Sequence, residues 1–272
     1  MPTLDPPIEL TPHHADTVER LGVRYTADPS VLALLLAGSI AHGFATVGAD
    51  VDFVAVVTPE EYRRRADAGC LTESSTVDCS YEGGYTDGKF VDVEFLRRVA
   101  HDGSEPARYA FCDARFVIDR DPSIRPLLAE VVAYPEIGVD DRIERYAAQL
   151  LAWQWYHGQA FEKRSRYLEL LALQKLTLFS CRIVLAANRR LYPFHKWMLR
   201  VTADAPHRPP HLLDDLDRLL HGGGAEFVDR HVRSMIAFAG LAHDDLARRW
   251  GGCFLRDNET TWMTGARSID DW

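Results

Sequence analysis

Short apolar runs separated by turn residues mark the first part of the chain. Residues 31–37 and 51–57 are continuous apolar runs bounded by turn-forming residues, and they predict two buried strands. Residues 89–96 alternate apolar and acidic side chains and predict a third strand, which a hairpin over the turn-rich segment 70–88 leads into. Residues 114–119 predict a last strand. Together these runs indicate a small mixed sheet.

Apolar residues three and four positions apart, as in a helix, lie before and between these strands and run through most of the chain after them. Helices are expected over residues 12–28, 59–68, 123–133, 141–160, 163–189, 211–221 and 225–249, separated by Pro, Gly and His. The pattern changes from α/β to all-α near Pro122. We therefore expect an α/β domain with flanking helices over residues 1–122, followed by an all-α helical bundle over residues 123–272.

Acidic residues stand out on two of the predicted strands. Side chains alternate between the two faces of a strand, so Asp50 and Asp52 are expected to project to one side. The same argument places Asp92 and Glu94 together on the third strand. An acid on an apolar strand is costly unless it is exposed or paired with a cation, and the strand alone leaves both explanations open. If the two strands are neighbours, the acids converge and their mutual repulsion calls for a bound metal.

The arrangement of these residues resembles a known superfamily. Gly38-Ser39, a gap of ten residues, Asp50-x-Asp52 and a third acid on a later strand resemble the nucleotidyltransferases that include DNA polymerase beta and the antibiotic nucleotidyltransferases. The resemblance implies that the Gly-Ser turn holds the phosphates of a nucleotide. It also implies that Asp50, Asp52 and Asp92 bind two Mg²⁺ ions.

A second stretch narrows the resemblance. Residues 176–184, with Arg182, and residues 193–197, with Lys196, look like the helical domain of the aminoglycoside adenylyltransferases that modify streptomycin and spectinomycin. In those enzymes the matching Arg and Lys contact ATP phosphates. The third-strand motif of the streptomycin enzymes aligns Asp92 with the catalytic base and leaves Glu94 as an additional acid, so either carboxylate could accept the proton.

The resemblance implies Mg²⁺-dependent transfer of AMP from ATP to a hydroxyl of a small molecule, with release of pyrophosphate, as in antibiotic modification. An aminoglycoside-like acceptor would suit an acidic site. Two alternatives remain open. One is an antitoxin-like enzyme that attaches AMP to a protein, although such minimal enzymes usually lack a long helical domain. The other is a nucleotide-binding protein without catalysis.

Composition restricts the partners. With 40 acidic against 31 basic residues and a net charge of −9, the chain does not have the charge of a protein that binds nucleic acid through many phosphates. The five cysteines show no metal-binding spacing and indicate reduced thiols, hence a cytoplasmic protein. We expect no signal peptide and no membrane span. The pattern leaves the oligomeric state open.

Overall fold

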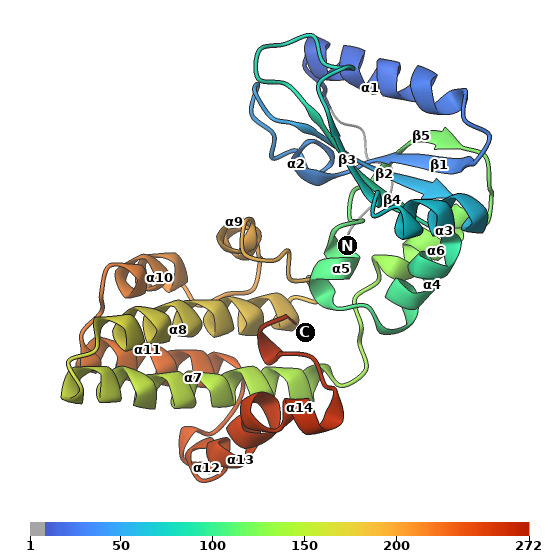
Figure 1. Cartoon of the computed structure of the whole chain (residues 1–272). Coiled ribbons are helices and arrows are strands. Elements are labelled where there is room, and N and C mark those ends of the chain that lie inside the picture. Colours follow the sequence, from blue (N-terminus) through green and yellow to red (C-terminus); the bar gives the residue numbers. More distant parts are fainter. Residues whose placement is uncertain (1–8, 272) are drawn as a thin grey trace. The chain divides into compact units, whose positions relative to one another are not determined.

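The computed structural model describes residues 9–271. The chain divides between Ala133 and Tyr134 into two compact units, which we call unit 1 and unit 2. This confirms the expected fold class, an α/β region with a small mixed sheet followed by an all-α region (Figure 1). The division lies eleven residues beyond the boundary that we placed at residue 122.

Unit 1 is built on a five-stranded sheet of order β3-β4-β2-β1-β5. Its strands are β1 (Val31–Leu36), β2 (Val51–Val57), β3 (Thr72–Ser75), β4 (Thr86–Val91) and β5 (Arg115–Asp119). Its helices are α1 (Pro12–Thr26), α2 (Gly38–Ala41), α3 (Pro59–Asp67), α4 (Val93–Asp102), α5 (Glu105–Tyr109) and α6 (Ile124–Val131). Strand β1 is antiparallel to β2 and β5, β3 is antiparallel to β4, and β2 is parallel to β4.

The core of unit 1 forms between the sheet and α1. Leu21 and Tyr25 of α1 pack with Val51, Phe53 and other residues on one face of the sheet, all of them buried. Figure 1 shows α1 along one side of the sheet and α4 and α6 on the other. Burying apolar area of this kind is the main favourable term in folding. The core fixes which face of β2 points inward and therefore which face presents Asp52.

Helix α6 belongs to unit 1, which explains the shift of the boundary. Its apolar residues Ile124, Leu128 and Val131 are buried. The guanidinium of Arg108 also donates hydrogen bonds to the carbonyls of Glu130 and Val131 at 3.2 and 3.1 Å. The sequence change at Pro122 marks the end of the strands, whereas the contacts of α6 extend unit 1 to residue 133.

Unit 2 is helical throughout. Its α-helices are α7 (Val139–Glu162), α8 (Arg166–Ala187), α9 (Met198–Ala203), α10 (Leu212–Leu220), α11 (Ala225–Phe238), α12 (His243–Ala247), α13 (Trp250–Phe254) and α14 (Thr261–Thr264). A π-helix over Leu255–Glu259 and a 3₁₀ turn over Ile269–Asp271 complete it. The single helix expected over 225–249 is interrupted at Gly240, which adopts a positive φ of 74° and separates α11 from α12.

Helix α8 has the length and apolar character of a membrane span, contrary to our expectation that no segment would. Its mean hydropathy reaches 1.6 over an 18-residue window, and 72% of that window is buried inside the protein. The helix packs along α7 in the interior of unit 2. Its composition is that of the core helix of a bundle.

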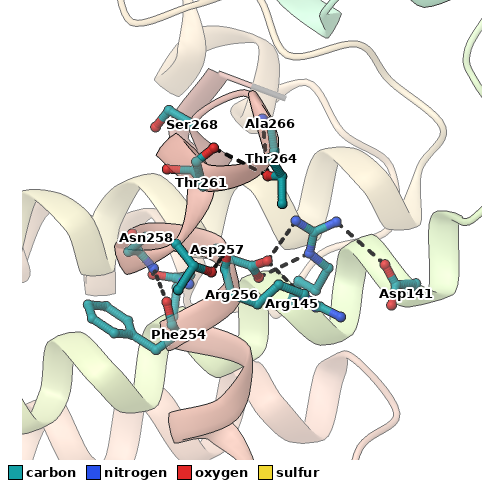
Figure 2. Close-up of polar contacts among 12 residues, drawn as sticks. Asp141, Arg145, Phe254, Arg256, Asp257, Asn258, Thr261, Thr264, Ala266 and Ser268 are labelled. Carbon is teal, nitrogen blue, oxygen red and sulfur yellow. Dashed lines mark hydrogen bonds and ion pairs between the residues drawn. The ribbon is translucent and has the colours of Figure 1, made fainter.

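A buried ion pair joins the π-helix to α7 (Figure 2). The guanidinium of Arg145 donates two hydrogen bonds to Asp257, at 3.0 and 2.8 Å, and the Asp257 side chain is fully buried. A second carboxylate, Asp141, lies 3.6 Å from Arg145 and is mostly exposed. A paired arginine and carboxylate can be buried because each neutralises the other. The pair fixes the segment after α13 against α7.

Candidate functional site

The Gly-Ser turn lies directly against Asp52. Gly38 follows β1 with a positive φ of 62°, and a Cβ atom added to it would lie 1.8 Å from Oδ2 of Asp52. The amide of Ala37 donates to the carbonyl of Asp52 at 2.9 Å, which locks the turn to β2. Only glycine fits here, because any side chain would overlap the carboxylate. Ser39 is buried within α2.

The third acid beside Asp52 is Asp87, which the sequence analysis did not select. Strands β2 and β4 are parallel, with Asp52 opposite Asp87. Residues paired in this way project to the same face of a sheet. Gly88, the next residue, lies on the core face, where an added Cβ would come 2.1 Å from the Phe53 ring. Asp87 therefore points away from the core, to the same side as Asp52, and both are half-buried.

The Tyr85 phenol lies near the same acids. A hydrogen bond to Asp50 raises the pKa of the Tyr85 phenol, and the negative charges of Asp50, Asp87 and Asp52 raise it further. Asp50 directly precedes β2 and Asp52 pairs with Asp87, so the three acids occupy one end of the sheet, where Gly38 lies against Asp52.

Asp92 and Glu94 are not part of this group, and the expectation for them is corrected. Strand β4 ends at Val91, which pairs with Val56 at the far end of β2. Asp92 follows, five residues from Asp87, a separation of roughly 16 Å at the rise of a strand. Its carboxylate accepts a hydrogen bond from the amide of Phe95 at 2.7 Å and begins α4. Asp92 is therefore the N-cap of α4, and not a strand residue as predicted.

Glu94 lies in the first turn of α4 rather than on a strand. Its side chain is 64% exposed and forms an ion pair with Arg97 at 3.3 Å. The buried residues of α4, Leu96 and Val99, have helical spacing. The apparent alternation of residues 89–96 therefore combines the end of a strand with the first turn of a helix.

The acids suit a hard divalent cation, but they do not form a closed cage for one. Within residues 9–271, no three or more His, Cys, Asp or Glu side chains are arranged to hold a metal ion by themselves. Mg²⁺ is usually held by one or two protein carboxylates together with waters and substrate phosphates. Asp50, Asp52 and Asp87 provide oxygen donors of that kind next to a turn that brings the backbone close. The oxygen donors beside the turn are of the kind that Mg²⁺ takes, and Asp92 lies at the other end of β4 from them.

Arg182 is buried inside unit 2. Its guanidinium lies between the rings of Tyr146 and Tyr192, 4.6 and 4.4 Å from their centroids. It donates to the Tyr146 hydroxyl and to the carbonyl of Asp270, the latter at 2.9 Å. The residue is 0% exposed. The structure places Arg182 in the core of unit 2, and the phosphate contact that the resemblance implies for it stays a prediction.

Lys196 is an exposed residue of the loop between α8 and α9. Its ammonium group lies 5.1 Å from the centroid of the Trp197 ring. The role in phosphate binding that the resemblance implies for Lys196 stays a prediction.

Two adjacent histidines and a tyrosine hold the loop that leads to Asp50. His13 and His14 contact the carbonyls of Val47 and Ala49 at 2.7 and 3.0 Å. The Tyr81 hydroxyl donates to the same Ala49 carbonyl at 2.6 Å, and its ring packs against both imidazoles. Ala49 precedes Asp50, so these side chains set the entry of the loop into β2. These contacts join residues 32 or more positions apart, so they left no local signal in the sequence.

Comparisons with known proteins give structural resemblances but no match to a family model. No protein-family model matches the chain, and no curated protein matches it. A solved nucleotidyltransferase-like protein from Exiguobacterium sibiricum 255-15 is similar in structure, with a TM-score of 0.47 and 11% sequence identity. The similarity covers 84% of this chain and 74% of that one.

Proposed function

We propose that the protein is a nucleotidyltransferase that transfers a nucleoside monophosphate from a nucleoside triphosphate, with ATP as the first donor to test, to a hydroxyl of a small molecule. The observation that carries the proposal is the group formed by Asp50, Asp52 and Asp87 against the Gly38-Ser39 turn. Carboxylates beside a glycine turn provide both the oxygen donors for a divalent cation and a close backbone approach for phosphates.

The reaction follows from these roles. The acceptor oxygen forms a bond to the α-phosphorus, the bond from that phosphorus to the oxygen bridging to the β-phosphorus breaks, and pyrophosphate leaves. The hydroxyl proton passes to a carboxylate of the Asp50, Asp52 and Asp87 group. Asp50, Asp52 and Asp87 would hold Mg²⁺, which neutralises phosphate charge when bound. Asp92 and Glu94 have no part in this scheme.

The test compares two isosteric substitutions in the site with one outside it. Asp52→Asn and Asp87→Asn are expected to lower Mg²⁺-dependent pyrophosphate release at least about 100-fold, the scale of one lost electrostatic contact to a transition state. Asp92→Asn is the matched control and is expected to keep wild-type activity, because asparagine also caps a helix. Binding of a non-hydrolysable ATP analogue with and without Mg²⁺ is measured in parallel by calorimetry.

Two outcomes would contradict the proposal. One is the absence of Mg²⁺-dependent binding of any nucleoside triphosphate to the wild-type protein. The other is a loss of activity in Asp92→Asn that equals the loss in Asp87→Asn, since that would indicate that Asp92 also acts in the reaction.

A further inference from the structure

A histidine with a buried side chain stands at the end of the short helix that the Gly-Ser turn begins. His42 is the C-cap of α2, and its amide donates to the Gly38 carbonyl at 3.1 Å. Its side chain is 4% exposed and packs against the rings of Tyr109 and Phe44, whose centroids lie 4.8 and 5.6 Å away. A buried polar group needs a hydrogen-bond partner, because burial without one costs its hydration free energy.

The partner of His42 is Asp113, which lies 71 positions away in the sequence. The Nδ1 atom of His42 is 3.1 Å from Oδ2 of Asp113. An ionised carboxylate only accepts hydrogen bonds, so Nδ1 carries the hydrogen and donates it. Asp113 adopts a φ of 59°, in the left-handed region that residues other than glycine rarely occupy. Such a conformation persists only where the surrounding structure holds it.

This contact lies at the same end of the sheet as the acids. Leu36, the last residue of β1, pairs with Phe53 of β2 on one side and with Arg115 of β5 on the other. Asp52 directly precedes Phe53. Asp113 lies two residues before Arg115. Strand β1 therefore runs between the acids and the histidine contact, and the Gly-Ser turn follows β1.

The turn and α2 are held from two sides. On the β2 side, Gly38 lies against Asp52. On the β5 side, His42 is bound to Asp113. Helix α2 has four residues, and so short a helix is not stable through its own hydrogen bonds. Its shape therefore depends on the contacts at its two ends.

We propose that the contact between His42 and Asp113 is a latch that holds the Gly38-Ser39 turn in the shape that receives phosphate groups. Neither residue binds the nucleotide or the metal in this scheme, and both are positioning residues. A turn that samples other shapes binds in only a fraction of the molecules, which weakens the apparent affinity. This inference rests on the proposed function for the role of the turn, whereas the latch itself can be tested without nucleotide.

The first experiment measures how firmly the latch holds the turn. Asp113→Gly removes the carboxylate, and glycine accepts the positive φ at this position. His42→Phe removes the Nδ1 donor and keeps a ring beside Tyr109 and Phe44. Hydrogen–deuterium exchange of the peptide that carries residues 38–44 is expected to be at least tenfold faster in both variants than in the wild type.

Two controls separate the latch from other effects of substitution. Asp113→Asn keeps an oxygen acceptor and tolerates a left-handed φ, so exchange within twofold of the wild type is expected. His221→Phe is matched to His42→Phe, because His221 is the C-cap of α10 and its Nδ1 lies 3.5 Å from the exposed Asp217. It is expected to leave exchange of residues 38–44 unchanged. If Asp113→Gly does not give a wild-type circular dichroism spectrum, His42→Phe replaces it in each comparison.

The second experiment measures the consequence for the nucleotide. Calorimetry with the non-hydrolysable ATP analogue and Mg²⁺ is expected to give a Kd at least fivefold higher in Asp113→Gly and His42→Phe than in the wild type. Asp113→Asn and His221→Phe are expected to bind the analogue within twofold of the wild type. A variant that only lowered global stability would not be rescued by asparagine in this way.

Exchange at the wild-type rate in both latch variants overturns the latch and leaves the proposed function intact. Faster exchange with an unchanged Kd for the analogue overturns the positioning role. An Asp113→Asn variant that matches Asp113→Gly in both measurements overturns the assignment of the hydrogen bond. Absence of nucleotide binding in the wild-type protein overturns the proposed function, while exchange of residues 38–44 still decides whether the latch holds the turn.

Discussion

Asp92 is a helix cap, and its contribution to stability is separable from the chemistry of the site. The carboxylate accepts the Phe95 amide hydrogen bond at the start of α4. Asp92→Ala is expected to cost about 1 kcal/mol, within the range of roughly 0.5–2 kcal/mol for a lost N-cap. Hydrogen exchange of the first-turn amides of α4 measures the loss, and faster exchange there is the expected result.

Glu94→Ala is the control, because Glu94 is exposed and makes only a surface ion pair. Its first-turn amides are expected to exchange at nearly the wild-type rate. Normal exchange in Asp92→Ala together with lost Mg²⁺ binding would mean that Asp92 acts on the metal after all.

The two site aspartates differ in how visible they are in the sequence. Asp52 belongs to the spacing of Gly38-Ser39 and Asp50-x-Asp52 that marked it in the sequence. In the structure the turn lies in contact with this acid. Asp87 stands in an Asp-Gly pair, which is also a common hairpin turn, so its sequence context favoured a loop. Its role depends on the register between β2 and β4, which is a contact between distant residues. Local pattern carries no information about that register.

Among the elements, strands with continuous apolar runs were predicted well, while elements defined by their ends were not. Strand β2 occupies the predicted residues 51–57, because both its faces are largely buried and its run is uninterrupted. Strand β4 is half-buried and passes into α4 within two residues. The alternating spacing of apolar residues in a strand and their 3.6-residue spacing in a helix therefore overlap there. The burial of Arg182 was not predicted for a related reason, since it depends on the tertiary packing of the guanidinium against Tyr146 and Tyr192.

The π-helix after α13 depends on a charge pair rather than on apolar packing alone. Asp257→Asn removes the buried carboxylate bound to Arg145 and leaves the guanidinium with the more distant, exposed Asp141, so it is expected to destabilise unit 2 by about 3–5 kcal/mol. Asp141→Asn removes an exposed partner of the same arginine and is expected to cost less than about 1 kcal/mol. Figure 2 shows both carboxylates on either side of Arg145.

Tryptophan fluorescence during urea denaturation measures this difference within unit 2, because all six tryptophans lie between residues 153 and 272. Equal midpoints for Asp257→Asn and Asp141→Asn would show that the buried pair contributes no more than the exposed one.

At the scale of the whole molecule, buried histidines make stability depend on pH. Burial is the largest influence on His14, His157 and His231, and it lowers the pKa of each below the ordinary value of 6.5. The unfolded chain therefore takes up these protons at a higher pH than the folded chain. The stability from these groups is complete above about pH 6.5 and is lost as the pH falls through the lower folded values.

The free energy of unfolding is accordingly expected to decrease between pH 7.5 and 5.5, a window in which carboxylates remain ionised. Urea denaturation of unit 2 followed by tryptophan fluorescence measures the slope. His231→Gln is expected to reduce the slope, and His221→Gln, at a side chain 76% exposed, is expected to leave it unchanged. A wild-type slope in both variants would show that His231 does not contribute to the pH dependence of stability.

Residues 269–271 contact α8, so unit 2 can be completed only late in synthesis. Ile269 is buried, Asp270 pairs with Lys175, and its carbonyl accepts from Arg182, which leaves the ribosome 88 residues earlier. All five strands of unit 1 end by residue 119, so the sheet can pair while translation continues. Unit 2 acquires this acceptor for Arg182 only after residue 270 has emerged, so a nascent chain should carry a finished sheet beside an unfinished bundle.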